Sequence, residues 1–180
     1  FDNTLFDTKA FLSQLAREWS ACGVPQALFS RTYRRVRREA LYSPRRHIFE
    51  IGSGAIKKKT ALLEKVQRVH DASRRFIFRD VVPSLKRWKR RGYRLILLTY
   101  GDRVFQREKL EKSGIAQLFE RVIVTRDPYK VAMVKRLANG SNNIVIIDDN
   151  FGALRRLHEK VGGLVTIHVE RYRPVDSRIS

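Results

Sequence analysis

Two adjacent carboxylates, Asp148 and Asp149, directly follow the apolar run at residues 144–147. Such a run, bounded by polar residues, is typical of a strand buried on both faces of a parallel sheet. Ligands of these sheets bind just beyond the carboxyl ends of the strands. Carboxylates placed there need a cation or hydrogen-bond donors, and Mg²⁺ favours carboxylate oxygens. The pair therefore indicates a candidate Mg²⁺ site, although either residue could instead begin a turn or cap the next helix.

Further polar side chains are expected at comparable places. Thr99 ends one predicted strand, and Lys130 lies at the start of the helix after another. Asp2 and Thr4 lie in the opening turn. Together these groups could bind Mg²⁺ and a phosphoryl group, with Lys130 neutralising oxygens on phosphorus and Thr99 donating a hydrogen bond. Taken singly, each also has a structural explanation, such as a hydroxyl that bonds a turn or caps a helix.

The elements that would position these residues alternate regularly after Pro83. The expected strands cover residues 93–99, 122–125, 144–147 and 164–169, and the expected helices cover 82–91, 103–112, 129–138 and 151–161. Repeated strand–helix units of this length predict a parallel sheet covered by helices on both faces. The fold class is therefore α/β, with a three-layer α/β/α core.

Residues 8–80 have a different pattern, in which everything is predicted to be helix or loop. Asp7 or Thr8 can cap a helix that ends at Gly23, and Pro25 suits the first turn of a second helix. A third long helix is expected after residue 59, whereas residues 44–59 are expected to be irregular. The segment is thus an all-helical insertion, and many of the arginines and lysines lie in it.

Composition limits the class of protein further. The chain has 180 residues, of which 43% are hydrophobic, enough for a packed core. It has no apolar run of roughly 20 residues, so no membrane span is expected. Cys22 is the only cysteine, and no secretory signal pattern is visible, which favours the cytoplasm.

The net charge of +20 admits several explanations. Such a field attracts nucleic acid or speeds the encounter with small anionic substrates, but it can also reflect general composition. Tyr33 and Trp88 lie among basic clusters and could stack on bases. Both occupy the apolar faces of predicted helices, however, and we expect them in the core. A nucleic-acid partner is therefore kept as an alternative.

The motifs resemble those of the haloacid dehalogenase (HAD) superfamily of Mg²⁺-dependent phosphohydrolases. Asp2 and Thr4, in Phe1-Asp2-Asn3-Thr4-Leu5, resemble the first motif from its second position onward. Thr99, Lys130 and the pair Asp148-Asp149 resemble the second, third and fourth motifs. The resemblance implies a Rossmann-like core.

The same resemblance implies roles for these residues. Asp2 would be the general acid and base, and Thr4 would steady its loop. Thr99 and Lys130 would hold the phosphoryl group. The implied metal ligands are Asp2, Asp148 and Asp149.

The sequence departs from the family pattern in three places. The family nucleophile is the first aspartate of the opening motif and would stand immediately before Phe1, together with the strand that carries it. We therefore expect the sequence to be an N-terminally truncated fragment of a chain that forms an aspartyl-phosphate intermediate. In addition, Tyr100 replaces the commoner asparagine, and no proline follows Lys130.

The resemblance also predicts the domains and the reaction. Residues 8–80 match the position and length of a C1 cap, residues 1–7 and 81–172 would form the core without its first strand, and 173–180 would be a tail. The predicted function is Mg²⁺-dependent hydrolysis of the phosphate monoester of a small metabolite. A phosphatase acting on nucleotides or nucleic-acid ends, and a non-catalytic relative that binds nucleic acid or protein, are the alternatives. The sequence indicates neither the particular substrate nor the oligomeric state.

Overall fold

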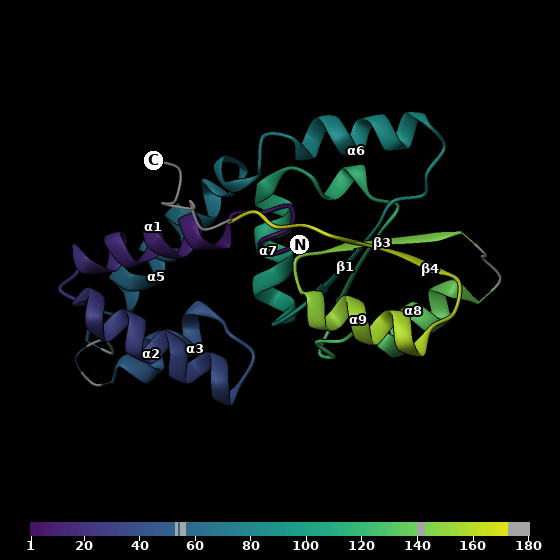
Figure 1. Ribbon diagram of the computed structural model, residues 1–180. Coiled ribbons are helices and arrows are strands. Elements are labelled where there is room, and N and C mark those ends of the chain that lie inside the picture. Colours follow the sequence, from purple (N-terminus) through teal and green to yellow (C-terminus); the bar gives the residue numbers. More distant parts are fainter. Residues whose placement is uncertain (53, 55–56, 140–142, 173–180) are drawn as a thin grey trace, which may run out of the picture.

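The computed structural model describes residues 1–52, 54, 57–139 and 143–172. Helices from the first half of the chain gather in one region, and the strands lie in a second region with their own helices (Figure 1). The order of elements after residue 80 confirms the predicted α/β class.

The helical region begins at α1 (Thr8–Ser20) and continues with α2 (Gln26–Glu39), α3 (Pro44–Ile51), α5 (Lys59–Asp71) and the 3₁₀ helix η1 (Ser73–Phe76). The Asp7 carboxylate caps α1 by accepting a hydrogen bond from the Ala10 N–H at 2.8 Å. The side chain of Trp19 is fully buried and donates a hydrogen bond to the carbonyl of Leu62 in α5 at 3.3 Å. These contacts tie α1 to α5.

The prediction of irregular structure at residues 44–59 is wrong for residues 44–51, which form α3. The hydroxyl of Ser43 accepts a hydrogen bond from the Arg46 N–H at 3.4 Å, and Pro44 occupies the first helical turn. A serine cap followed by proline starts a helix as readily as it ends one, because proline at that position loses no intrahelical hydrogen bond. Residues 53, 55 and 56 of the predicted loop lie outside the described part of the chain.

The second region contains α6 (Val81–Arg90), β1 (Ile96–Tyr100), α7 (Arg103–Ser113), η2 (Ala116–Leu118), β2 (Arg121–Thr125), α8 (Val131–Ala138), β3 (Ile144–Asp148), α9 (Phe151–Lys160) and β4 (Leu164–His168). The predicted parallel pairing is confirmed: Thr99 lies opposite Val124, and Asp148 lies opposite His168. Within the described residues the strands form two separate pairs, β1–β2 and β3–β4. Side chains join the pairs, because Leu98 of β1 packs against the apolar cluster between α8, α9 and β4.

The chain enters and leaves the helical region along two adjacent segments. The Asp7 N–H donates to the carbonyl of Phe76 at 2.6 Å, and the Phe78 N–H donates to the carbonyl of Leu5 at 3.1 Å. Arg171 braces the same place, since its guanidinium donates to the carbonyl of Thr4 at 2.9 Å. This paired connection is compatible with an insertion at residues 8–80, which stays a prediction.

Two further observations concern the helices and the C-terminal residues. No helix in the described ranges combines the length and apolar character that crossing a lipid bilayer requires. The predicted tail, residues 173–180, lies outside the part of the chain that the structure describes.

Candidate active site

The opening loop is a tight turn that presents Asp2 and Thr4. The carbonyl of Phe1 accepts hydrogen bonds from the N–H groups of Leu5 at 2.9 Å and Phe6 at 3.1 Å. Asn3 adopts a left-handed backbone with φ of 54°, a conformation that asparagine tolerates better than most residues. The turn therefore fixes the directions of the two side chains on either side of Asn3.

Thr4 connects this loop to the end of β3. Its hydroxyl is buried and donates a hydrogen bond to Oδ1 of Asp149 at 2.9 Å. The two residues are 145 positions apart in the sequence. The structure thus brings together two of the predicted site residues.

Lys130 and Asp148 form a second contact at the same strand end. Lys130 Nζ lies 2.5 Å from Asp148 Oδ2, and both residues are at most 9% exposed. Burial acts to raise the pKa of Asp148, but the Lys130 ammonium and a hydrogen bond from the Asn150 N–H outweigh it and lower that pKa. Lys130 itself has a left-handed backbone, with φ of 61°, immediately before α8. A non-glycine residue in this conformation carries strain, of the kind that clusters at functional sites.

The two contacts lie in one neighbourhood. Thr4 Oγ1 lies 3.5 Å from the carbonyl oxygen of Asp2 and donates its hydrogen bond to Asp149, the residue that follows Asp148. The opening loop and the end of β3 therefore lie side by side.

The Asp2 side chain is held from another direction. It accepts hydrogen bonds from Thr8 Oγ1 at 2.7 Å and Gln106 Nε2 at 2.7 Å, and it forms an ion pair with Lys109. Burial acts to raise the pKa of Asp2, but the Lys109 ammonium contributes most to lowering it to about 2. Asp2 is therefore ionised at neutral pH and is held by three side-chain donors.

Sequence reasoning missed Lys109 and Gln106. Lys109 is 1% exposed, and its Nζ lies 4.8 Å from the ring centroid of Phe105 and 5.1 Å from that of Phe6. A signal for both residues exists, because positions 105, 106, 109 and 110 recur with the spacing of one helical face. Two polar residues on a face shared with Phe105 and Leu110 indicate a buried polar contact.

Thr99 is buried at 2% exposure near the end of β1. Gln106 links this strand end to the opening loop, since its Nε2 also donates to the carbonyl of Tyr100 at 3.3 Å. Gly101 makes this approach possible: a Cβ there would lie 2.8 Å from Gln106 Nε2. Thr99 thus reaches the other predicted residues through its neighbours, not by a direct hydrogen bond to one of them.

The helical region contributes aromatic side chains beside Asp2. Burial raises the pKa of Tyr33, and the Asp2 carboxylate adds to that increase. The ring of Tyr42 contacts Tyr33 at a centroid distance of 4.9 Å and Phe105 of α7 at 5.5 Å. Tyr33 packs against the hydrophobic core, as does Trp88, and both are only partly buried.

The predicted metal ligands do not form a ready-made cage. In the described part of the chain, no group of three histidine, cysteine or acidic residues is arranged to hold a metal ion. Asp2 is engaged by Lys109, whereas Asp148 and Asp149 stand together at the end of β3. Mg²⁺ is commonly bound through one or two carboxylates and keeps several waters, so the oxygen donors of this pair fit its chemistry. The assignment of Asp2, Asp148 and Asp149 as metal ligands stays a prediction.

Comparison with known proteins agrees with the fold. The family profile described as haloacid dehalogenase-like hydrolase matches residues 1–152. No protein in a search of curated proteins matches the chain.

Solved structures resemble the chain at low identity. A protein described as a haloacid dehalogenase-like hydrolase from Burkholderia xenovorans is 24% identical, with a TM-score of 0.71 over 93% of this chain and 80% of its own. YfnB from Bacillus subtilis, described as a HAD-hydrolase and solved with bound magnesium, is 16% identical, with a TM-score of 0.64 over 98% of this chain and 87% of its own. These likenesses show a shared fold. Since the profile also covers most of the sequence, the chain belongs to the haloacid dehalogenase-like hydrolases.

Proposed function

We propose that the protein is a phosphatase that hydrolyses the phosphate monoester of a small metabolite and requires Mg²⁺. The observation that carries this proposal is the meeting of the Thr4–Asp149 and Lys130–Asp148 contacts at the end of β3. A buried ammonium beside paired carboxylates provides charges of both signs. This is the combination that binding a phosphoryl dianion with a divalent cation needs.

The predicted site residues have distinct roles in this proposal. Lys130 neutralises charge on the phosphoryl oxygens, and the Thr99 hydroxyl donates a hydrogen bond to one of them. Thr4 holds the opening loop against Asp149. When bound by Asp148 and Asp149, Mg²⁺ supplies Lewis-acid polarisation of the phosphoryl group. The magnesium bound by YfnB, a protein of the same fold, supports this assignment.

Asp2 is proposed as the general acid and base. With a pKa of about 2 it is a carboxylate at neutral pH, so it can accept a proton from water. Donating a proton to a leaving group requires a higher pKa. A phosphoryl dianion close to Asp2 would raise that pKa, because a nearby like charge disfavours the ionised carboxylate. Substrate binding itself would then prepare Asp2 to act as the acid.

The proposed reaction passes through an aspartyl-phosphate intermediate. The family resemblance assigns the nucleophile to an aspartate directly ahead of Phe1, a position outside the 180 residues of the sequence. Attack of that carboxylate on phosphorus would release the alcohol, and water activated by Asp2 would then release phosphate.

The test is hydrolysis of p-nitrophenyl phosphate by the full-length protein, with Mg²⁺ and with excess EDTA. We expect turnover that EDTA abolishes, and Asp149→Asn should remove activity at ordinary Mg²⁺ concentrations. Glu111→Gln is the matched control, because it makes the same carboxylate-to-amide change at an exposed position of α7. Full activity of Asp149→Asn would exclude Asp149 from the site, and turnover unaffected by EDTA would refute the Mg²⁺ requirement.

A further inference from the structure

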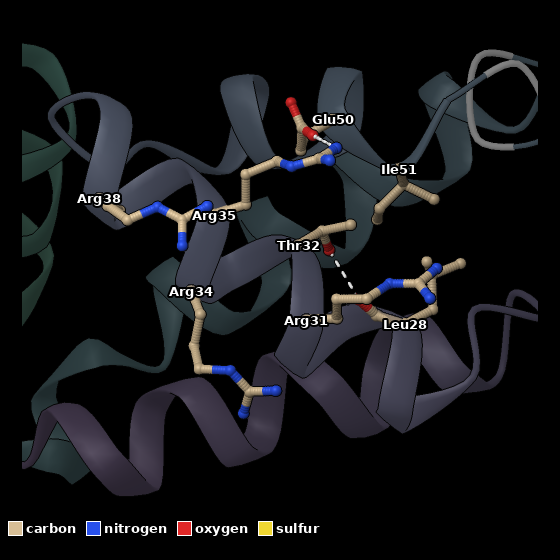
Figure 2. A pocket seen from close by; sticks show the side chains of 8 residues that line it. All are labelled: Leu28, Arg31, Thr32, Arg34, Arg35, Arg38, Glu50 and Ile51. Carbon is tan, nitrogen blue, oxygen red and sulfur yellow. Dashed lines mark hydrogen bonds and ion pairs between the residues drawn. The ribbon is translucent and has the colours of Figure 1, made fainter.

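A row of arginines runs along one side of α2. Arg31, Arg34, Arg35 and Arg38 follow one another at helical spacing, over an axial length of about 10 Å. They line a cavity of about 470 Å³ between α2 and α3. Figure 2 shows Arg38 at one end of this groove and Arg31 at the other, beside Leu28 and Ile51.

The positive charge of the groove is only partly balanced. Glu50 is the single carboxylate among the described side chains that line the groove, and its Oε1 lies 2.5 Å from Arg35 Nη1. Within the described residues, neither Arg31 nor Arg34 forms an ion pair with a carboxylate. Like charges three and four positions apart on a helix repel one another. An anion bound in the groove would relieve this repulsion.

The proposed phosphatase reaction does not account for the groove. Its lining residues belong to α2 and α3, whereas the candidate active site is built from the opening loop, α7, α8 and the strand ends. Tyr33 of α2 instead connects toward α7, because its ring contacts Tyr42, which contacts Phe105. Tyr33 does not line the groove. The helix thus serves two separate sites.

We propose that this groove is a second binding site, which takes a compact anion with two or more phosphoryl groups. Guanidinium groups bind phosphate oxygens in pairs of parallel hydrogen bonds, and several of them along one helix suit several linked phosphoryl groups. The volume lies within the range of sites for small molecules. Leu28 and Ile51 offer an apolar contact for the remainder of such a ligand.

A single strand of nucleic acid fits the groove less well. Proteins that bind such strands stack successive bases on aromatic side chains. Among the described residues, no aromatic side chain lines this groove, and the exposed arginines are arranged around a cavity instead of a flat track. The lining therefore favours a small polyanion.

The test is calorimetric titration of the full-length protein with inorganic triphosphate, in EDTA and at 150 mM salt. The double variant Arg31→Gln with Arg34→Gln should weaken binding about tenfold or more, since each arginine offers charge-assisted hydrogen bonds. The control, Arg87→Gln with Arg90→Gln, removes the same charge at the same spacing from exposed positions of α6. It should change the affinity less than about twofold, because charges exposed on another helix are largely screened at this salt concentration.

A second variant should strengthen triphosphate binding instead of weakening it. Glu50→Gln removes the carboxylate that pairs with Arg35 and releases that arginine, so it should strengthen triphosphate binding severalfold. Weaker or unchanged binding would overturn the proposal, as would equal losses in the two arginine double variants.

Two further arms separate the groove from other sites. Lys130→Gln should leave triphosphate binding intact, whereas a loss would place the ligand at the strand ends and overturn the proposal. A 20-nucleotide single-stranded RNA that binds more tightly than triphosphate, and loses more affinity in Arg31→Gln with Arg34→Gln than in the α6 control, would replace the compact anion by nucleic acid and overturn the proposal. The phosphatase proposal is independent of these outcomes, because the titrations need no turnover.

Discussion

Two aspartate–lysine pairs, each with a buried lysine, lie at the candidate active site and are built differently. Asp2 meets Lys109 on the side of α7, where Thr8 and Gln106 supply two further donors. Asp148 meets Lys130 at the end of β3, with one backbone N–H as its additional donor. Phenyl rings surround Lys109. Lys130 has a strained, left-handed backbone conformation and pairs with the first of two adjacent aspartates. Asp2 therefore has three side-chain donors, whereas Asp148 has one ammonium and one backbone N–H.

This difference indicates that the two lysines have different roles. Lys109, which is 1% exposed and surrounded by aromatic rings, mainly holds the fold and orients Asp2, because its ammonium is paired with the Asp2 carboxylate. Lys130, which has a strained backbone conformation at the carboxyl end of a strand, is suited to binding a substrate. Substitutions at Lys109 should therefore affect stability most, and substitutions at Lys130 should affect activity most.

The largest expected effect is the loss of activity in Lys130→Gln. Removing a preorganised positive charge from a phosphoryl site should lower kcat by a factor of roughly 10² to 10³. Steady-state kinetics of the full-length protein at saturating Mg²⁺ measures this, with Lys135→Gln on an exposed face of α8 as the control. A loss below about threefold would remove Lys130 from the phosphoryl site.

Lys109→Met should give the largest loss of stability. It leaves Asp2 with its ionised carboxylate but without its cation, and breaking a buried pair costs about 3 kcal/mol. The Asp2 side chain keeps 28% exposure, so the loss should lie at the lower end of the range for buried pairs. Urea denaturation measures it, and the double variant Lys109→Met with Asp2→Asn should recover part of the loss. If Lys109→Met destabilised the protein no more than the substitution of an exposed lysine does, the Asp2–Lys109 pair would not have the structural role that distinguishes it from Asp148–Lys130.

The pH dependence of stability should sharpen the comparison. The pKa of Asp2 is lowered from 3.8 to about 2 in the folded protein. A lowered folded-state pKa stabilises the protein above the unfolded-state pKa, and this contribution disappears as the pH falls through the folded-state value. We expect about 2 kcal/mol to be lost between roughly pH 4 and pH 2. Urea denaturation at a series of pH values should show a shallower decline in Asp2→Asn, and identical curves would contradict the lowered pKa.

The smallest effect is expected at the connection between the two regions. Arg171 forms two hydrogen bonds with the Asp80 carboxylate, at 2.8 and 3.0 Å, and one with the carbonyl of Thr4. Because Asp80 is largely exposed, Arg171→Ala should cost only about 1 kcal/mol. Amide hydrogen exchange should detect faster exchange at the paired segments near Phe76 and Phe78. Unchanged exchange there would show that Arg171 does not brace the connection.

Much of the secondary structure was predictable because its signals are local. Asp7 caps α1 as expected, and Gly114 ends α7 in a left-handed conformation that glycine adopts without strain. The strand predicted from residue 93 begins only at Ile96. Arg94 instead pairs with Glu120 through hydrogen bonds from its exposed guanidinium, a contact that no local pattern encodes.

The candidate site was predictable in its residue types but only partly in its contacts. Polar residues after apolar runs indicated Asp148, Asp149 and Thr99, because strand ends are defined locally. Two of the partners of Asp2, Gln106 and Lys109, lie more than 100 positions away in α7. A lysine on an amphipathic helix usually faces solvent, so the burial of Lys109 follows from tertiary packing and not from its neighbours in sequence.

The most direct test of the account is a crystal structure of the full-length protein with Mg²⁺ and orthovanadate, an analogue of a phosphoryl group in transfer. We predict vanadate within hydrogen-bonding distance of Lys130 Nζ and Thr99 Oγ1, with the metal ion on the carboxylates of Asp148 and Asp149. Vanadate bound elsewhere, while Lys130 keeps its contact with Asp148 and no metal ion lies at the end of β3, would contradict the account.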